Sequence, residues 1–179
     1  MTDVLYFDTD CLSAFLWVKA EHLLVSLYSG NIIVPQQVYN ELSNPHTPHL
    51  KERLNVMIDN NDVLLKTIST NTPEFNLYMK LTNRPEKGRS IIGRGEAAVI
   101  ALASASSGII ASNNLKDVAS YTLELGLRHI TTGDIILRAH ETSLITENDG
   151  NIIWSAMLAK KRKIGAGSFT DYIAMHRHN

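Results

Sequence analysis

The sequence predicts an α/β protein: a three-layer α/β/α sandwich with a mostly parallel sheet of about five strands and a C-terminal helical appendage. Two observations support this prediction. Short apolar runs recur along the chain, and amphipathic segments with helical spacing lie between them. Strands that alternate with helices pair in parallel through right-handed crossovers. The 179 residues suffice for one domain with a sizeable core and a modest extension.

The expected elements follow from apolar periodicity and from helix-stop and turn residues. The expected strands are 4–7, 31–34, 63–68, 108–111 and a weak one at 128–130. The expected helices are 11–29 with a break near Ala20, 36–42, 49–60, one whose first turn holds Pro73, 94–107, 114–125 ended by Gly126, 132–144, one starting at Thr146, and 168–176. We therefore expect a main domain at 1–144 and a helical extension at 145–179 that packs on it.

Composition narrows the class of protein. Apolar residues make up 44% of the chain and charged residues 20%, which is an ordinary balance for a soluble protein, and the net charge is −1. Any basic surface must therefore be local. Cys11 is the only cysteine, which excludes an internal disulfide and a cysteine-rich zinc site. No secretory signal and no stretch of membrane-spanning length is visible, so we expect a cytoplasmic protein with no membrane partner.

Four acidic residues stand at ends of the expected elements. Asp8 and Asp117 follow apolar runs, Glu41 lies just beyond another, and Glu96 begins the Ala-rich helix. Taken singly, each could be a helix cap, a dipole partner or a solvated residue. Taken together, they gather at the sheet edge where open α/β sheets bind ligands. Carboxylates at that edge repel one another unless a cation compensates, so we expect a hard divalent metal, Mg²⁺ or Mn²⁺.

Such a metal site predicts a type of chemistry. A divalent ion makes bound water easier to deprotonate and polarises a phosphodiester oxygen. Because Cys11 fits a buried thiol better than a reactive nucleophile, the acids favour phosphodiester hydrolysis, and nucleic acid is the expected substrate. Seven histidines raise the alternative of a zinc site, but no pair has the helical i, i+4 spacing with a catalytic Glu.

The ordered motifs resemble a PIN domain. The matching segments are Asp8-Thr9, Ile33-Val34-Pro35 through Glu41-Leu42, Gly95-Glu96-Ala97-Ala98 and Ser112-Asn113-Asn114-Leu115-Lys116-Asp117. The resemblance covers the chain from Asp8 to about Leu137. It implies a metal-dependent nuclease whose metal-site acids are Asp8, Glu41, Glu96 and Asp117. Because many bacterial and archaeal PIN domains are toxin ribonucleases, it also implies an RNA substrate, a homodimer and an antitoxin protein as partners.

Two departures from the family pattern leave alternatives open. Many members carry an Asp where this chain has Asn113-Asn114, whereas others carry the acid three residues later, which is the register of Asp117. Asp10 stands where Ser or Asn is common, and is either a fifth acid in the cleft or the N-cap of the first helix. Thr9 and Ser112, together with Asn113 and Asn114, are candidate supporting residues that could hold a water or merely stabilise turns.

Basic residues near the expected site are candidates for RNA contacts. Arg89 and Arg94 flank the start of the Ala-rich helix, where arginines could bind phosphate or simply be solvated. The other basic run is Lys160, Lys161, Arg162 and Lys163, which could instead favour a helix C-terminus.

The leading prediction is a Mg²⁺- or Mn²⁺-dependent endoribonuclease, which could be the toxin of a toxin–antitoxin pair. One alternative is a non-catalytic PIN fold that binds RNA or protein, which the neutral Asn113-Asn114 pair favours. A phosphomonoesterase is a third reading, because Asp8-Thr9-Asp10 matches such enzymes, but the later motifs that they need are absent.

Overall fold

Five parallel strands form the centre of the described fold. The computed structural model of the chain describes residues 3–83 and 91–176, and at 115–117 it describes the backbone without the side chains. The strands are β1 (Leu5–Phe7), β2 (Ile32–Pro35), β3 (Val63–Lys66), β4 (Ile109–Ala111) and β5 (Arg128–Ile130). They lie in the order β3-β2-β1-β4-β5, and every pairing between them is parallel. The expected parallel α/β sheet is therefore confirmed.

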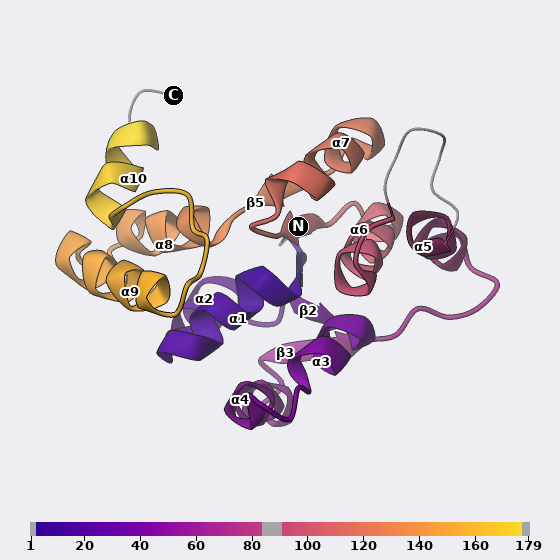
Figure 1. Cartoon of the computed structure of the whole chain (residues 1–179), viewed down its shortest axis with the longest axis horizontal. Coiled ribbons are helices and arrows are strands. Elements are labelled where there is room, and N and C mark those ends of the chain that lie inside the picture. Colours follow the sequence, from indigo (N-terminus) through magenta and orange to yellow (C-terminus); the bar gives the residue numbers. More distant parts are fainter. Residues whose placement is uncertain (1–2, 84–90, 177–179) are drawn as a thin grey trace.

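The helices of the described residues surround this sheet. They are α1 (Thr9–Val18), α2 (Glu21–Tyr28), α3 (Gln36–Leu42), α4 (Pro48–Asp59), α5 (Pro73–Asn83), α6 (Arg94–Ser106), α7 (Leu115–Leu125), α8 (Thr132–Glu141), α9 (Glu147–Ala159) and α10 (Phe169–His176). Figure 1 shows α5 and α6 on one side of the strands and α2, α8 and α9 on the other. The three-layer α/β/α arrangement is therefore confirmed as well.

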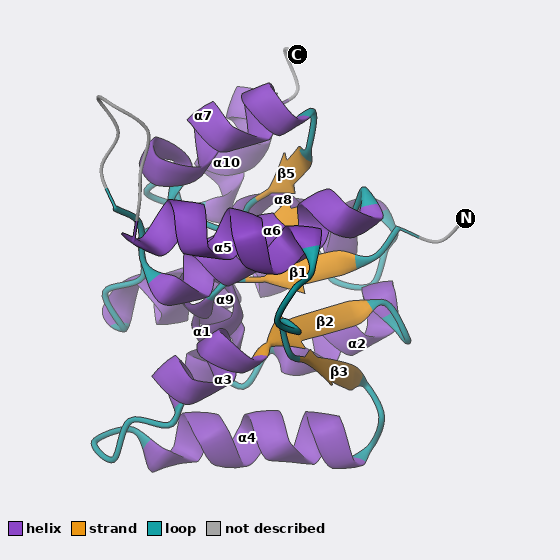
Figure 2. Cartoon of the chain, turned by 90° about the vertical axis from the view of Figure 1, so that its right-hand side faces the viewer, coloured by secondary structure: helices purple, strands orange, loops and turns teal. Residues whose placement is uncertain are grey.

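The Ala-rich helix α6 is the central packing element of its layer. It contacts β1, β2 and β4, and it also packs against α3, α5 and α7 (Figure 2). Its buried side chains are mostly alanines, which allow the helix to lie close to the sheet. Because α6 begins beside the ends of these strands, its first turn, including Glu96, lies at the carboxyl edge of the sheet.

The strand register places two site residues beside each other. Phe7 of β1 pairs with Ala111 of β4, so the next residues, Asp8 and Ser112, leave neighbouring strands at the same level. The strand order reverses between β1 and β4, since the chain proceeds from β1 to β3 on one side and then returns to β4 on the other. This reversal is the topological switch point at which open α/β sheets bind ligands.

The long first helix breaks as expected, near Ala20. Lys19 adopts a left-handed conformation with φ of 60° and ends α1, and α2 begins at Glu21. In the described residues no single helix is both long and apolar enough to cross a membrane; α1 and α2 pass such a test only as a pair, and that pair is bent by 117°.

The C-terminal helices pack on the sandwich through aromatic side chains. Trp154 of α9 is fully buried, and its ring lies 5.8 Å from that of Phe169 and 5.0 Å from that of Tyr172. Helix α9 contacts α1, α8 and α10. The chain after α9 is therefore fixed against the domain, which determines where its basic residues lie.

Candidate active site

Asp8 is the most buried of the acidic site residues whose side chains the structure describes, with 2% of its surface exposed. It is the N-cap of α1: one carboxylate oxygen accepts a hydrogen bond from the Cys11 N–H at 2.7 Å. The other oxygen accepts a hydrogen bond from the Ser112 hydroxyl, across the switch point. Helix α1 thus begins at Thr9, and Asp10 lies exposed in its first turn, so the expectation that Asp10 caps this helix was wrong.

Burial changes the acidity of Asp8. It raises the pKa of the Asp8 carboxyl to about 7, chiefly because burial disfavours the charged form. The hydrogen bonds from Ser112 and the Cys11 N–H lower the pKa, whereas the negative charges of Asp10 and Glu96 raise it. These three carboxylates therefore act on one another electrostatically, and a cation among them would relieve that repulsion.

Glu41 reaches the start of α6 from α3. One of its carboxylate oxygens accepts a hydrogen bond from the Gly95 N–H at 2.8 Å, and the other accepts one from the Thr9 hydroxyl. A Cβ atom on residue 95 would lie 2.6 Å from that second oxygen, so the glycine makes this approach possible. Glu41 therefore joins α1, α3 and α6, and its negative charge favours the positive end of α6.

Glu96 lies in the first turn of α6 and contacts the loop after β4. Its carboxylate accepts a hydrogen bond from the Asn114 side-chain amide. The Asn114 N–H donates in turn to the Ser112 hydroxyl at 3.1 Å. Ser112 and Asn114, both predicted as supporting residues, thus connect the carboxylates of Asp8 and Glu96.

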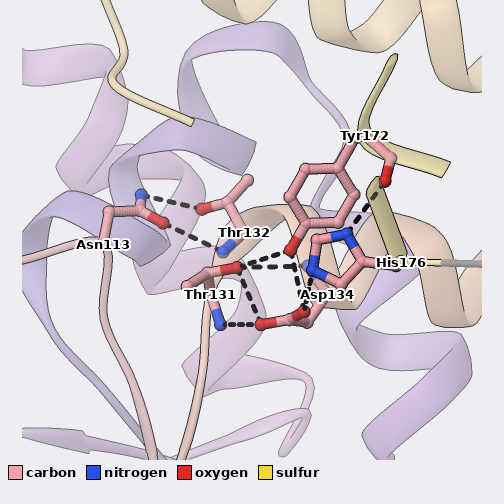
Figure 3. A network of polar contacts seen from close by, with 6 residues as sticks. All are labelled: Asn113, Thr131, Thr132, Asp134, Tyr172 and His176. Carbon is pink, nitrogen blue, oxygen red and sulfur yellow. Dashed lines mark hydrogen bonds and ion pairs between the residues drawn. The ribbon is translucent and has the colours of Figure 1, made fainter. Parts of the chain in front are cut away.

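Asn113 has a different environment from its neighbour. Its side chain exchanges two hydrogen bonds of 2.9 Å with Thr132, one to the threonine hydroxyl and one from the threonine N–H (Figure 3). The Thr132 hydroxyl is fully buried and lies 3.4 Å from the sulfur of Cys11. The sequence indicated Thr132 only as a possible cap of α8, because nothing local indicates that this residue fixes the loop after β4.

A second part of the same network attaches the C-terminal helix. Thr131 and Asp134 form a capping box that starts α8, and the Tyr172 hydroxyl donates to Asp134 at 2.8 Å (Figure 3). His176 stacks on Tyr172 with 4.1 Å between ring centroids, and its Nε2 lies 4.0 Å from Asp134. These contacts fix α10 against α8, and they involve none of the carboxylates of Asp8, Glu41 and Glu96.

The remaining predicted residues are distributed unequally around the site. Arg94 is exposed in the first turn of α6, and Lys160 lies over the Trp17 ring at 5.4 Å. Lys161, Arg162 and Lys163 line a cavity that also includes Asp10, Asn113 and Asn114. Arg89 lies outside the described residues. The backbone of Asp117 lies in α7, but its side chain is outside what the structure describes.

The acids fit a divalent ion only in part. Within residues 3–83 and 91–176, apart from the side chains at 115–117, no three His, Cys, Asp or Glu residues form a group that could hold a metal. Magnesium commonly uses only one or two carboxylates and keeps several waters. Asp8 and Glu96 supply oxygen donors of that type, and a cation beside Asp8 would offset part of the cost that burial and the neighbouring charges impose on its carboxylate.

The fold and this edge define the class of protein: an all-parallel α/β/α protein with carboxylates at the switch point of its sheet. The model of a family described as a PIN domain matches residues 4–173, so the chain belongs to the PIN-domain family. PIN domains are generally nucleases and typically depend on divalent metal ions. Among curated proteins, none matches the chain.

Proposed function

We propose that this protein is a metal-dependent endoribonuclease that hydrolyses RNA phosphodiester bonds. The observation that carries the proposal is the buried Asp8 carboxylate at the switch point, whose pKa is raised chiefly by burial and further by the charges of Asp10 and Glu96. Membership of a family of nucleases supports the same reaction class. Mg²⁺ or Mn²⁺ would be held by Asp8 and Glu96, with Asp117 as a further ligand, and when bound would supply activation of water and stabilisation of charge at the phosphodiester.

The protein's own residues would position these groups. Ser112 and the Cys11 N–H fix the two oxygens of Asp8, and Asn114 fixes one oxygen of Glu96. Such support limits the movement of metal-binding carboxylates, and loss of an outer partner typically lowers metal affinity by about 10–100-fold. Glu41 would act through the starts of α6 and α1, since one of its oxygens already accepts a hydrogen bond from Gly95 and the other accepts one from Thr9.

A cleavage assay tests the proposal. We expect the metal-stripped protein to cleave single-stranded RNA only after Mg²⁺ or Mn²⁺ is added. Asp8→Asn and Glu96→Gln should each lower the cleavage rate by more than about 100-fold, since each removes a metal-binding charge. Asp117→Asn should do the same if its register is right. The matched control is Glu52→Gln, an exposed residue of α4. Cleavage that persists at the wild-type rate in Asp8→Asn would refute the assignment.

A non-catalytic RNA- or protein-binding module is the second candidate. One observation favours it: Asp8 caps α1 and Glu41 accepts an N–H from the first turn of α6, so their hydrogen bonds have a structural explanation. Firm RNA binding without metal-dependent cleavage, in all variants alike, would establish this alternative.

Four further expectations stay predictions: the toxin role, the antitoxin partner, the homodimer and the cytoplasmic setting. The toxin role requires that expression of the wild type arrests growth and that Asp8→Asn relieves this arrest.

A further inference from the structure

A cavity beside the acidic site is lined mainly by basic and amide side chains. It has a volume of about 350 Å³, and its lining residues are Asp10, Asn113, Asn114, Lys161, Arg162 and Lys163. We call it the basic pocket. Half of these residues come from α1 and the loop after β4, and the other half come from the segment after α9, far away in the sequence.

The segment that supplies the three cations is held in place by several contacts. The Arg162 N–H donates to the Met157 carbonyl at 3.0 Å, and the Arg162 guanidinium lies 3.5 Å from the Ser13 hydroxyl of α1. Ile164, which follows, is 4% exposed and belongs to the core. The indole N–H of Trp154 donates to the Ala166 carbonyl at 3.0 Å. The cations are therefore presented by an ordered segment rather than by a free tail.

The positive charges of the basic pocket outnumber the negative charge among its lining residues. None of the three cations has a carboxylate within ion-pair distance in the part of the chain that the structure describes. Asp10 is the one acidic residue among the lining side chains. Three like charges around one cavity repel each other, and an anion that enters it would relieve that repulsion. Lysine and arginine are the usual protein partners of phosphate.

The basic pocket shares residues with the acidic site. Asn114 lines the pocket, donates its side-chain amide to Glu96, and donates its N–H to Ser112, which in turn donates to Asp8. Asp10 lines the pocket and raises the pKa of Asp8. An anion in the pocket would therefore lie next to the carboxylates. A polymer with a negative charge at every residue can place one phosphate there and a neighbouring one at the acids.

We infer that the basic pocket is a subsite for a backbone phosphate of single-stranded RNA, adjacent to the phosphodiester that is cut. The inference rests on the proposed function and adds to it that Lys161 and Lys163 hold the substrate. The segment after α9 would thereby belong to the substrate-binding surface. The subsite needs no metal, because its cations are side chains.

RNA binding in EDTA tests the subsite separately from cleavage. The probe is a short, fluorescein-labelled single-stranded RNA, and the readout is anisotropy over a range of salt concentrations. We expect Lys161→Glu/Lys163→Glu to weaken binding by about 10-fold or more. Two lost phosphate contacts should also lower the slope of log K against log salt by about 1.4, at about 0.7 per contact for single strands. Lys161→Gln/Lys163→Gln should produce a smaller change in the same direction.

The matched control changes the net charge equally but at another surface. Lys19→Glu/Lys51→Glu alters lysines at the end of α1 and on α4, neither of which lines the basic pocket. We expect this control to bind RNA within about threefold of wild type, because only a distant, screened charge changes. Equal weakening by both pairs would overturn the subsite in favour of a general charge effect.

Poly-glutamate serves as a second probe. If the protein bound poly-glutamate as tightly as RNA, this would overturn the inference that the pocket holds a phosphate rather than an acidic protein segment.

The outcomes distinguish the subsite from the nuclease proposal. Wild-type binding by Lys161→Glu/Lys163→Glu, with metal-dependent cleavage intact, overturns the subsite and leaves the nuclease. Weakened binding in that variant, with no cleavage by wild type, supports the subsite on a binding module and overturns the nuclease. No RNA binding by wild type overturns the subsite directly. Melting temperatures equal to wild type show that the exposed lysines were replaced without loss of the fold.

Discussion

At the scale of single residues, Asp8 combines a structural role with a chemical one. Its two oxygens accept hydrogen bonds from two different elements, so it caps α1 and joins β1 to the loop after β4. Its burial and its acidic neighbours also make its negative charge costly. Deprotonation of this one residue should therefore be visible in the stability of the metal-free protein.

The stability of metal-free protein should fall as the pH rises from about 4 to about 7 through the contribution of Asp8. The pKa of Asp8 is about 7 in the folded protein, whereas the ordinary pKa of an aspartate side chain is 3.8, so the folded state binds more protons in this window. Stability falls with pH wherever the folded state binds more protons than the unfolded state. The contribution is fully present below the unfolded pKa and lost as the pH passes the folded pKa. Urea denaturation at a series of pH values measures it.

Two comparisons make this test specific. Asp8→Asn has no titrating group, so its unfolding free energy should lack this part of the pH dependence. Mg²⁺ should stabilise the wild type more at high pH than at low pH, because it competes with the proton for the same carboxylate. A wild-type pH profile that coincides with that of Asp8→Asn would contradict a raised pKa at Asp8.

At the scale of elements, the contact between Glu41 and the start of α6 requires a glycine at position 95. Gly95 gives Glu41 room to accept its N–H, and the same carboxylate also holds Thr9 at the start of α1. Three helices are therefore joined at one carboxylate.

Gly95→Ala should impair function more than stability. The new Cβ would lie 2.6 Å from a Glu41 oxygen, and the carboxylate can move away because it is the end of a flexible side chain. Alanine is also the better helix former by up to about 1 kcal/mol. We therefore expect an unfolding free energy within about 1 kcal/mol of wild type, with cleavage lowered by about 10-fold or more through the loss of outer support.

The control is Gly167→Ala, where the nearest atom to a new Cβ would be Asp171 Oδ2 at 3.5 Å, an ordinary contact. Cleavage and urea unfolding are measured for both variants. Wild-type cleavage by Gly95→Ala would show that the position of Glu41 is unimportant for the reaction.

At the scale of the whole molecule, the C-terminal helices complete the fold and bring the basic pocket to the acids. Trp154 is the largest fully buried side chain of this region, and its ring contacts both Phe169 and Tyr172. The family match extends through α9 and into α10, as far as residue 173.

Trp154→Ala should lower the unfolding free energy by about 3–5 kcal/mol, the usual cost of removing a large buried aromatic side chain. It also removes the hydrogen bond to Ala166, so RNA binding should weaken as the segment with Lys161 and Lys163 loosens. Ile152 lies on the same helix with 61% of its surface exposed, and Ile152→Ala should change stability by less than about 0.5 kcal/mol. Equal destabilisation by the two variants would show that α9 is not docked as described.

The sequence by itself determined the layers of this protein, and it indicated the edge of the sheet at which the candidate site lies. Apolar runs alternating with helical patterns are local signals, and they gave each described strand to within two residues at either end and the break near Ala20. The order of acids at element ends is also local, and it pointed to the carboxyl edge of the sheet. The first helix begins two residues earlier than predicted, because Asp8 caps it. The hydrogen bond from the Ser112 hydroxyl to the other oxygen of Asp8 depends on the pairing of β1 with β4, which no local pattern shows.

Tertiary structure alone decided how these residues meet. Glu41 accepts a hydrogen bond from Gly95, 54 positions away, and Asn113 donates one to Thr132, 19 positions away. No local pattern could therefore show whether such a side chain binds a metal or stabilises a distant helix or loop. The same is true of the basic pocket, whose cations follow α9 while its acid and amides come from α1 and the loop after β4. Periodicity reports which face of an element is buried, whereas the partners of a polar side chain depend on how distant elements pack.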